Sequence, residues 1–534
     1  MKRPDWRAPL TVAFERSLSF LEGLPERPVG PQATAAQIRA SLGELSDAGR
    51  APDEIVRSLA AAVEPGLSAM PSGRFFGWVI GGGLPAAIAA DWMTVAWDQN
   101  AGSHQGTPSA AAVEQVAIAW VLELLDLPRH ASAALVTGAQ MANTVCLAAA
   151  RNAVLAEHGW NVEADGLCGA PRINVLVGGE RHDTVMRSLR LLGLGAARAE
   201  PIDTDDNGRM RPSLLAKRLP EIEGPVIVCA QAGNVSTGGM DPLAEIADVV
   251  AARRARSGKG DTWLHVDGAF GLWARASRTL RARATGAERA DSWATDGHKW
   301  PNVPYDCGIA IVAHPLPHRR AMAMEAAYLP ASDDGERSPF DWTPELSRRA
   351  RGFALYAALA ELGRSGMEDL VDRCCAHART FRDRLSSVAG VEVLNEVELN
   401  QVLVRFTPVT GDPDAHTRAV TERIAKDGTC FASGTTWRGK AALRISVSNW
   451  STDESDVERS IEAIVRAHRA PLVSQGYRGP RRRCATVSSA SPASITQAGN
   501  SSGSSKRTCS TSRSANPLAT EPSPSRGSGG QRNA

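Results

Sequence analysis

The 534-residue sequence predicts an α/β protein with a mainly parallel sheet that is covered by helices on both faces. Two observations support this fold class. Apolar, strand-like runs alternate with helical stretches, which is the pattern of strand–helix repeats. The apolar runs are nearly continuous, as expected for strands buried on both faces. With 43% hydrophobic and 22% charged residues, the chain is long enough to form more than one domain.

The expected strands follow one another through the first two thirds of the chain, and helices are expected between them at 141–157 and 241–255. The strands are expected at 134–137, 173–179, 225–233, 262–270, 291–297 and 307–314. Ligands in such sheets bind outside the carboxyl ends of the strands. The motifs described below sit at such strand ends.

Two strand ends carry an acid and a lysine that are 32 residues apart. Asp267 lies in HVDGAFG, and Lys299 lies in DSWATDGHKW. A lysine amine can form a Schiff base with the aldehyde of pyridoxal phosphate (PLP), and an aspartate can keep the pyridine nitrogen protonated. Taken alone the pair is a weak signal, because such an Asp is often a helix cap and such a Lys a solvated charge.

The flanking residues make the signal specific. HVDGAFG, ADSWATDGHKW and VPYDCGIAIV resemble the core of the group II pyridoxal-dependent amino-acid decarboxylases, the family of aromatic amino-acid and glutamate decarboxylases. Further matching segments run in the family's order from about Gly73 to about Ile464. The resemblance implies the PLP-dependent transferase fold type I, with a seven-stranded sheet, a smaller C-terminal α+β domain and a homodimeric assembly.

The resemblance also implies the chemistry, namely PLP-dependent decarboxylation of an L-amino acid through an external aldimine and a quinonoid intermediate. Lys299 is then the Schiff-base lysine and Asp267 the partner of the ring nitrogen. His182 would stack on the ring and help to position the substrate carboxylate. Arg444, in ALRISVSNW, would either grip that carboxylate or tie the two domains together.

Other positions are expected to hold the cofactor. Backbone N–H groups at a helix start can cradle a phosphate, and VTGAQMAN offers such a turn in place of the family's TSGG(S/T)EAN segment. By the resemblance, one residue hydrogen-bonds the ring oxygen, one lies under the ring, and one beside Lys299 orients phosphate or substrate carboxylate. The expected cofactor residues are Thr137, Gly138, Ala139, Gln140, Asn234, Ala269 and His298.

One departure from the family concerns the reaction outcome. Aromatic amino-acid decarboxylases carry a loop tyrosine that protonates the substrate carbon after carbon dioxide leaves, and the matching segment 329–349 has none; Pro339 and Phe340 lie there instead. Oxidative decarboxylation–deamination to an aldehyde, or transamination, is therefore the alternative. Tyr328, His182 or a water would be alternative proton donors. A silent scaffold is disfavoured by the intact Asp267 and Lys299.

The chain is expected to divide into four parts: an N-terminal helical arm (1–72), a large PLP-binding domain (73–325), a small C-terminal domain (326–473) and a disordered basic tail (474–534). In the small domain a helix is expected over 345–363. The tail has nine Lys or Arg residues and one acid, Glu521, so the body is mildly acidic. The tail lacks interleaved aromatics, which makes nucleic-acid binding unlikely to be its role.

The remaining features predict a cytoplasmic enzyme. Nine cysteines occur without CxxC pairs, the start of the chain lacks a signal-peptide pattern, and polar residues interrupt the uncharged run 131–150. We expect no membrane span and no metal. The substrate side chain stays open: Phe75, Phe76 and Trp78 could line an aromatic pocket, although such residues are more often core.

Overall fold

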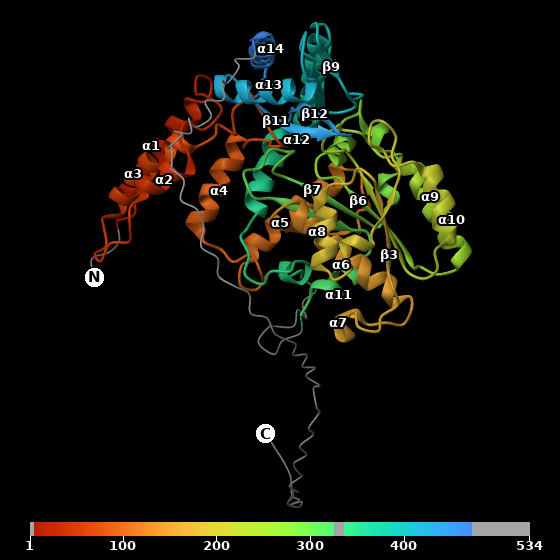
Figure 1. Ribbon diagram of the computed structural model, residues 1–534. Coiled ribbons are helices and arrows are strands. Elements are labelled where there is room, and N and C mark those ends of the chain that lie inside the picture. The colour runs from red at the N-terminus through yellow and green to blue at the C-terminus, as the bar shows by residue number, and fades with distance from the viewer. Residues whose placement is uncertain (1–4, 325–335, 472–534) are drawn as a thin grey trace, which may run out of the picture. The chain divides into compact units, whose positions relative to one another are not determined.

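The computed structural model describes residues 5–324 and 336–471, which lie in the first of two compact units, 1–473 and 474–534. Its larger sheet has seven strands in the order β2-β8-β7-β6-β5-β3-β4 (Figure 1). The strands are β2 (Ser132–Val136), β3 (Asn174–Gly178), β4 (Glu200–Ile202), β5 (Val226–Gln231), β6 (Thr262–Asp267), β7 (Ser292–Asp296) and β8 (Gly308–Val312).

The sheet is mainly parallel, as predicted. Strands β4, β3, β5, β6 and β7 pair in parallel, and β8 runs antiparallel to both of its neighbours, β2 and β7. Strands β2, β5, β6, β7 and β8 are buried along their whole length, which agrees with their continuous apolar sequences. The fold-type-I prediction is confirmed.

Helices cover the sheet and connect its strands (Figure 1). Helix α6, which contains the expected segment 141–157, packs against β7, β8 and β6. The helices of this region are α4 (Pro85–Trp97), α5 (Pro108–Leu124), α6 (Ala139–Ala156), α7 (Val162–Asp165), α8 (Asp183–Leu191), α9 (Pro212–Arg218), α10 (Leu243–Ser257) and α11 (Pro315–Met322).

A second, five-stranded sheet has the order β1-β11-β12-β10-β9. Its strands are β1 (Phe75–Phe76), β9 (Val391–Val393), β10 (Gln401–Phe406), β11 (Phe431–Trp437) and β12 (Lys440–Ser446). Helix α13 (Pro413–Asp427) packs on β10, β11 and β12, and α14 (Glu454–Arg469) packs on α13. Strand β1 pairs in parallel with β11, so a short piece of the segment expected in the large domain lies in the small sheet. The remaining domain boundaries stay predictions.

The expected helix over 345–363 is wrong at its start. Helix α12 (Gly352–Ser386) begins later and is kinked at Gly363, which has a positive φ of 59°. Residues before it are held in an extended course by tertiary contacts: Ala101 N–H donates to Arg348 O, and Arg348 N–H donates to Asn100 Oδ1. These long-range bonds override the helical tendency of the segment.

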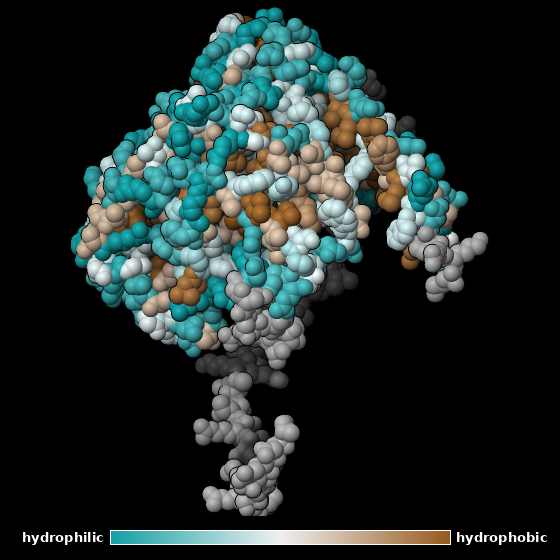
Figure 2. Space-filling view, turned by 180° about the vertical axis from the view of Figure 1, so that it is seen from behind, coloured by the Kyte–Doolittle hydropathy of each residue, from teal (hydrophilic) through white to brown (hydrophobic). Residues whose placement is uncertain are grey.

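The segment expected to form the N-terminal arm contains α1 (Arg7–Glu22), α2 (Ala35–Leu42) and α3 (Pro52–Val63). Helix α1 packs on α3, and a Thr34–Gln37 capping box starts α2. Large hydrophobic side chains stay exposed on α1 and on α4, among them Phe14 and Trp92. Figure 2 shows hydrophobic side chains gathered in the middle of the body and beside the arm.

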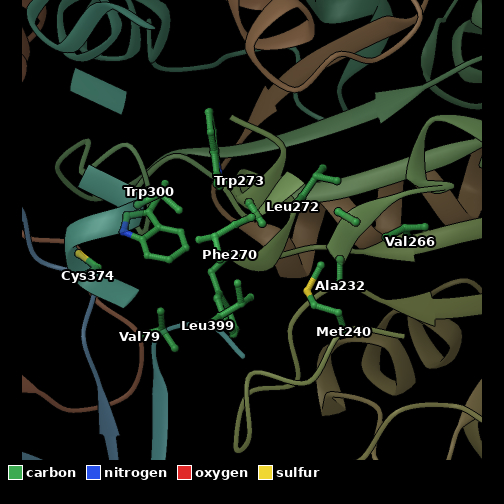
Figure 3. Packing of buried hydrophobic residues seen from close by; sticks show 14 of the residues in the cluster. Val79, Ala232, Met240, Val266, Phe270, Leu272, Trp273, Trp300, Cys374 and Leu399 are labelled. Atoms are coloured by element: carbon green, nitrogen blue, oxygen red, sulfur yellow. The ribbon is translucent and has the colours of Figure 1, made fainter. Parts of the chain in front are cut away.

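A buried aromatic core lies behind the ends of β6 and β7. Phe270, which follows Asp267, and Trp300, which follows Lys299, meet edge to face with ring centroids 6.4 Å apart (Figure 3). Trp273 is also buried and donates its indole N–H to Asp296 O at 3.1 Å. One core therefore fixes the positions of both residues that the sequence analysis selected first.

The loop after Lys299 is tied to the small sheet by Asn302. The Asn302 amide donates to Lys299 O at 2.5 Å and to Ser448 O at 3.0 Å, and its oxygen accepts from Trp450 N–H at 2.7 Å. Gly81 passes so close to Lys299 O and Asn302 that a Cβ would not fit there. The loop that follows Lys299 is thus held by the segment that follows β12.

None of the helices in the described part of the chain combines the length and apolar character needed to cross a membrane. The cysteines in that part are all free, and all but Cys168 are buried. The tail predictions for 474–534 and the possible donor Tyr328 lie outside the described residues.

Candidate active site

A cavity of about 200 Å³ opens at the carboxyl ends of β5, β6 and β7 and at the start of α6. Most of the residues expected from the sequence line it. These are Gly138, Ala139, Gln140, His182, Asp267, Ala269, His298 and Lys299. Segments far apart in the sequence therefore meet where the strand order predicted a ligand site.

Lys299 points its amine at a carboxylate that the sequence analysis missed. Its Nζ lies 2.9 Å from Asp296 Oδ2, and the other Asp296 oxygen accepts the Ala139 N–H at 2.5 Å. Asp296 is only 2% exposed. The available signal was an acid at the end of β7, three residues before the lysine. This ion pair holds the lysine amine inside the cavity.

Asp267 ends β6 and is 5% exposed. Its carboxylate accepts hydrogen bonds from Asn143 Nδ2 at 3.2 Å and from Ala269 N–H at 3.3 Å. Burial raises the pKa of Asp267, while nearby His182 and Lys299 and the Asn143 bond act in the opposite direction. A cationic partner such as a protonated pyridine nitrogen would compensate this buried carboxylate.

His182 caps the start of α8. Its Nδ1 accepts from Thr184 N–H at 3.2 Å and from the Thr184 hydroxyl at 2.8 Å. These bonds assign the proton of the neutral ring to Nε2. Burial lowers the pKa of His182 below its usual value. The residue is thus a neutral imidazole with one N–H donor and a flat face at the cavity wall.

His298 lies between the lysine loop and Tyr305. Its Nδ1 accepts from Cys307 N–H at 3.3 Å, and its Nε2 is 3.5 Å from Asp296 Oδ1. The His298 ring stacks on Tyr305, with centroids 4.3 Å apart. Burial lowers the pKa of His298 and, with Asp296, raises the pKa of Tyr305 to about 12. Tyr305 was not singled out by the sequence analysis.

The start of α6 has the form of a phosphate cradle. The first N–H groups of a helix have no intrahelical acceptor, and those of Gln140 and Met141 stand in this position. Gln140 donates its side-chain amide to Ser188 Oγ at 3.0 Å. Gly138 and Gly308 pack so closely that a Cβ on Gly308 would overlap the Gly138 backbone. Two glycines thus allow β8 to lie against the cradle.

Three expected residues do not line this cavity. Thr137 is exposed at the end of β2. Asn234 is buried and already used: its amide donates to Glu180 O at 2.9 Å, and its oxygen accepts from Ser236 N–H and Thr237 N–H. Gly233 and Val235 face the cavity instead. In this structure the Asn234 side chain therefore stabilises the turn in which it lies.

Arg444, on β12, is the third expected residue that does not line the cavity. It is 8% exposed, and within residues 5–324 and 336–471 its side chain has no hydrogen-bonding or ion-pairing partner. Burial lowers its pKa, and its charge in turn lowers the pKa of His182. A buried guanidinium without a partner is costly, so this residue favours an anionic ligand beside His182.

The remaining aromatic candidates belong to the small sheet. Phe75 stacks on Phe431 with centroids 5.0 Å apart, and Trp78 packs against the same ring. Phe76 is buried against Phe381. None of these side chains lines the cavity around Lys299 as the described residues form it.

A lysine at a strand end, a buried aspartate across the cavity, a flat histidine and free N–H groups at a helix start fit PLP. This fold and site define a fold-type-I PLP-dependent enzyme. Residues 38–407 match the pyridoxal-dependent decarboxylase conserved domain, and the chain belongs to this family. It is a PLP-dependent carboxy-lyase that decarboxylates an L-amino acid.

Named relatives agree with this assignment. Tryptophan decarboxylase 1 of Oryza sativa subsp. japonica is 28% identical over 492 residues, covering 86% of this chain and 93% of the relative. The crystal structure of Oryza sativa TDC with PLP and tryptamine has a TM-score of 0.80 at 25% identity, covering 88% of this chain and 99% of that one. Phenylacetaldehyde synthase of Arabidopsis thaliana is 23% identical over 430 residues, covering 77% and 85%.

Proposed function

We propose that Lys299, Asp267 and His182 are the catalytic residues of this decarboxylase. The observation that carries the proposal is that all three line one cavity at the sheet edge. When bound, PLP supplies an electron sink for the substrate Cα. Lys299 would hold the cofactor aldehyde and yield it to the substrate amine, Asp267 would keep the pyridine nitrogen protonated, and His182 would present its face to the ring.

The cofactor phosphate would be held at the start of α6. The N–H groups of Ala139 and Gln140 are the proposed donors, with Gly138 allowing close approach and His298 adding a side chain. Ala139 N–H is at present bonded to Asp296, so this bond would have to yield to the phosphate. Ala269 is small enough to lie under the ring. Thr137 and Asn234 stay proposed contacts, supported only by the resemblance.

The substrate carboxylate is proposed to lie between His182 and Arg444. Changing Arg444 to Gln should lower kcat/KM by about 10- to 100-fold, mainly through KM, since a hydrogen bond to a charged group contributes about 1.5–3 kcal/mol. Arg444→Lys should recover part of this loss. Steady-state kinetics measure KM and kcat separately and so check that the effect is mainly on KM. Arg405→Gln, which removes an Arg405–Asp414 pair in the small domain, is the matched control and should leave KM unchanged.

The expected reaction yields carbon dioxide and amine in equal amounts. The test is to incubate the PLP-loaded protein with a panel of L-amino acids in air and to quantify carbon dioxide, amine, aldehyde and hydrogen peroxide. Tyr305 beside His298 is a further group to examine as proton donor, because its hydroxyl stays protonated at neutral pH. Carbon dioxide from no amino acid in the panel would contradict the proposal.

A second candidate is aldehyde synthesis, favoured by the absence of tyrosine from 329–349. The described end of this segment places Phe340 in a buried site, where its N–H donates to Gly102 O at 3.0 Å. In the same assay, aldehyde with equimolar peroxide would identify this outcome. Transamination would give neither carbon dioxide nor peroxide.

We also propose a homodimer in the cytoplasm that acts on a small amino-acid substrate. Exposed Trp92, Met93, Val95 and Trp97 on α4 support burial against a second copy. The free, mostly buried cysteines support a reducing compartment. Sedimentation of the full chain should give twice the 56.6 kDa chain mass, and Val95→Glu should shift it toward the monomer. A monomeric wild-type protein would exclude the dimer.

A further inference from the structure

A chain of four hydrogen bonds runs along the face of the large sheet that α6 covers, from the start of β6 to Asp267 at its end. Trp263 Nε1 lies 2.8 Å from Ser292 Oγ, and Ser292 Oγ lies 2.9 Å from His265 Nδ1. His265 Nε2 lies 2.8 Å from Asn143 Oδ1. Asn143 Nδ2 then lies 3.2 Å from Asp267 Oδ2. The five side chains come from β6, β7 and α6.

The direction of this chain is set by its two ends, an indole N–H that can only donate and a carboxylate that can only accept. An indole N–H can only donate, so Ser292 Oγ accepts from Trp263 and its own hydroxyl proton is free to point to His265 Nδ1. His265 then carries its proton on Nε2 and donates to Asn143 Oδ1. The Asn143 amide is thereby oriented with its NH₂ group toward Asp267. Each bond in the series has one donor and one acceptor, and the last acceptor is a carboxylate.

The surroundings keep this arrangement in one state. His265, Ser292 and Asn143 are each 0% exposed. Burial lowers the pKa of His265 to about 3, so the imidazole is neutral at physiological pH and keeps one donor and one acceptor. A buried amide that presented its oxygen to the Asp267 carboxylate would place two acceptors together, which is unfavourable in a low-dielectric interior.

We propose that His265, held by Ser292 and Trp263, is a positioning residue that acts through Asn143 to keep Asp267 ionised and aimed at the pyridine nitrogen of the cofactor. This inference rests on the proposed role of Asp267. His265 itself touches neither the cavity nor the reacting atoms. It would set the strength of the electron sink from two residues earlier on the same face of β6.

The loss of this residue has a specific consequence. Without the His265 N–H, Asn143 Oδ1 is left unpaired in a buried site, and only the bonds of its NH₂ group to Asp267 and, at 3.4 Å, to Thr184 Oγ1 still orient the amide. The donor to Asp267 is therefore weakened. The pKa of the Asp267 carboxyl then rises, because the Asn143 bond had lowered it. The carboxylate takes a larger share of the proton that it shares with the pyridine nitrogen, so the ring nitrogen is less protonated. We expect kcat to fall about tenfold, since a hydrogen bond to a charged group is worth about 1.4 kcal/mol or more.

The test uses the full chain loaded with PLP labelled with ¹⁵N in the ring. The ¹⁵N chemical shift of the bound cofactor reports protonation of the ring nitrogen and needs no turnover. His265→Leu should move the shift toward the unprotonated value. His265→Gln places an N–H donor near the position of Nε2 and should restore most of the wild-type shift. Ser292→Ala, a small change, should shift it in the same direction as His265→Leu.

The chain provides a matched control in His318. This histidine is also 0% exposed, its Nδ1 lies 2.8 Å from Ser132 Oγ, and its Nε2 lies 3.0 Å from Trp342 O. Burial lowers its pKa to about 3 as well. It has no bond to Asp267. His318→Leu should therefore cost stability as His265→Leu does but leave the ¹⁵N shift unchanged.

A variant of Asp267 distinguishes the proposed role of His265 from the proposed role of Asp267. Asp267→Asn should abolish protonation of the ring nitrogen, and an unchanged shift there would refute the proposed role of Asp267 itself. If Asp267→Asn shifts the signal while His265→Leu and Ser292→Ala do not, the cofactor placement stands and the positioning role of His265 is overturned. Equal shifts for His318→Leu and His265→Leu would also overturn it.

Discussion

Changing Lys299 to Ala is expected to remove the visible absorption of the bound cofactor and to lower kcat by at least about 10³-fold. Both effects have one cause, because no other lysine lines the cavity formed by the described residues and so no other amine can form the covalent bond. Absorbance after PLP loading and carbon dioxide release measure the two effects. Exposed Lys259→Ala is the matched control and should behave as wild type.

The variant also removes the cation that faces Asp296. This carboxylate is 2% exposed. Once the lysine is gone, it keeps the hydrogen bond from Ala139 N–H and the contact with His298. The circular dichroism spectrum of the variant should therefore be recorded with its activity. A folded Lys299→Ala protein that still shows the visible band would place the Schiff base on another residue and refute the proposed site.

Changing Arg348 to Ala is expected to lower the free energy of unfolding by about 3–5 kcal/mol, the usual cost of removing one partner of a buried ion pair. Arg348 NH1 lies 2.7 Å from Glu114 Oε2, and both side chains are almost completely buried. The guanidinium also donates to Ala101 O and Leu135 O, each at 2.7 Å. The change leaves the buried Glu114 carboxylate with only the longer ion pair to Arg337, 3.8 Å away, and two carbonyl groups without their donor.

Urea unfolding of the PLP-loaded proteins measures this effect. Arg278→Ala is the control, because the Arg278–Glu368 pair is on the surface and is screened by solvent, so the unfolding midpoint should not change. Arg348 lies outside the cavity, and kcat of the folded variant should stay within a few-fold of wild type. An unfolding curve that matches wild type would show that Glu114 finds another partner.

The sequence was informative where function and local pattern coincide. Continuous apolar runs predicted the buried strands, and Asp267 and Lys299 were singled out because the motifs around these strand ends resemble the family. Strand β4 was missed because Glu200–Ile202 is short and contains Pro201, and β11 because Gly434 and two threonines interrupt its apolar pattern. The helix expected over 345–363 was misplaced because the bonds of Arg348 are formed with residues far away in the sequence.

Residues that act through other residues were not visible in the sequence. Asn143 and His265 are 122 positions apart, and only the packing of α6 on β6 brings them together. Asn234 shows the opposite case: its residue type suits a cofactor contact, but the turn already uses both ends of its amide. Residue type predicts what a side chain can do, and the fold decides what is left for it to do.

The position of Asn302 bears on how this enzyme can be divided or recombined. Its amide joins the carbonyl of Lys299 to Ser448 and Trp450, so a fragment that ends before residue 325 would carry the lysine but lose the groups that fix its loop. Chimeras between relatives should keep 297–307 and 446–452 from the same parent. Lobes expressed separately should regain cofactor binding only when they are mixed and associate.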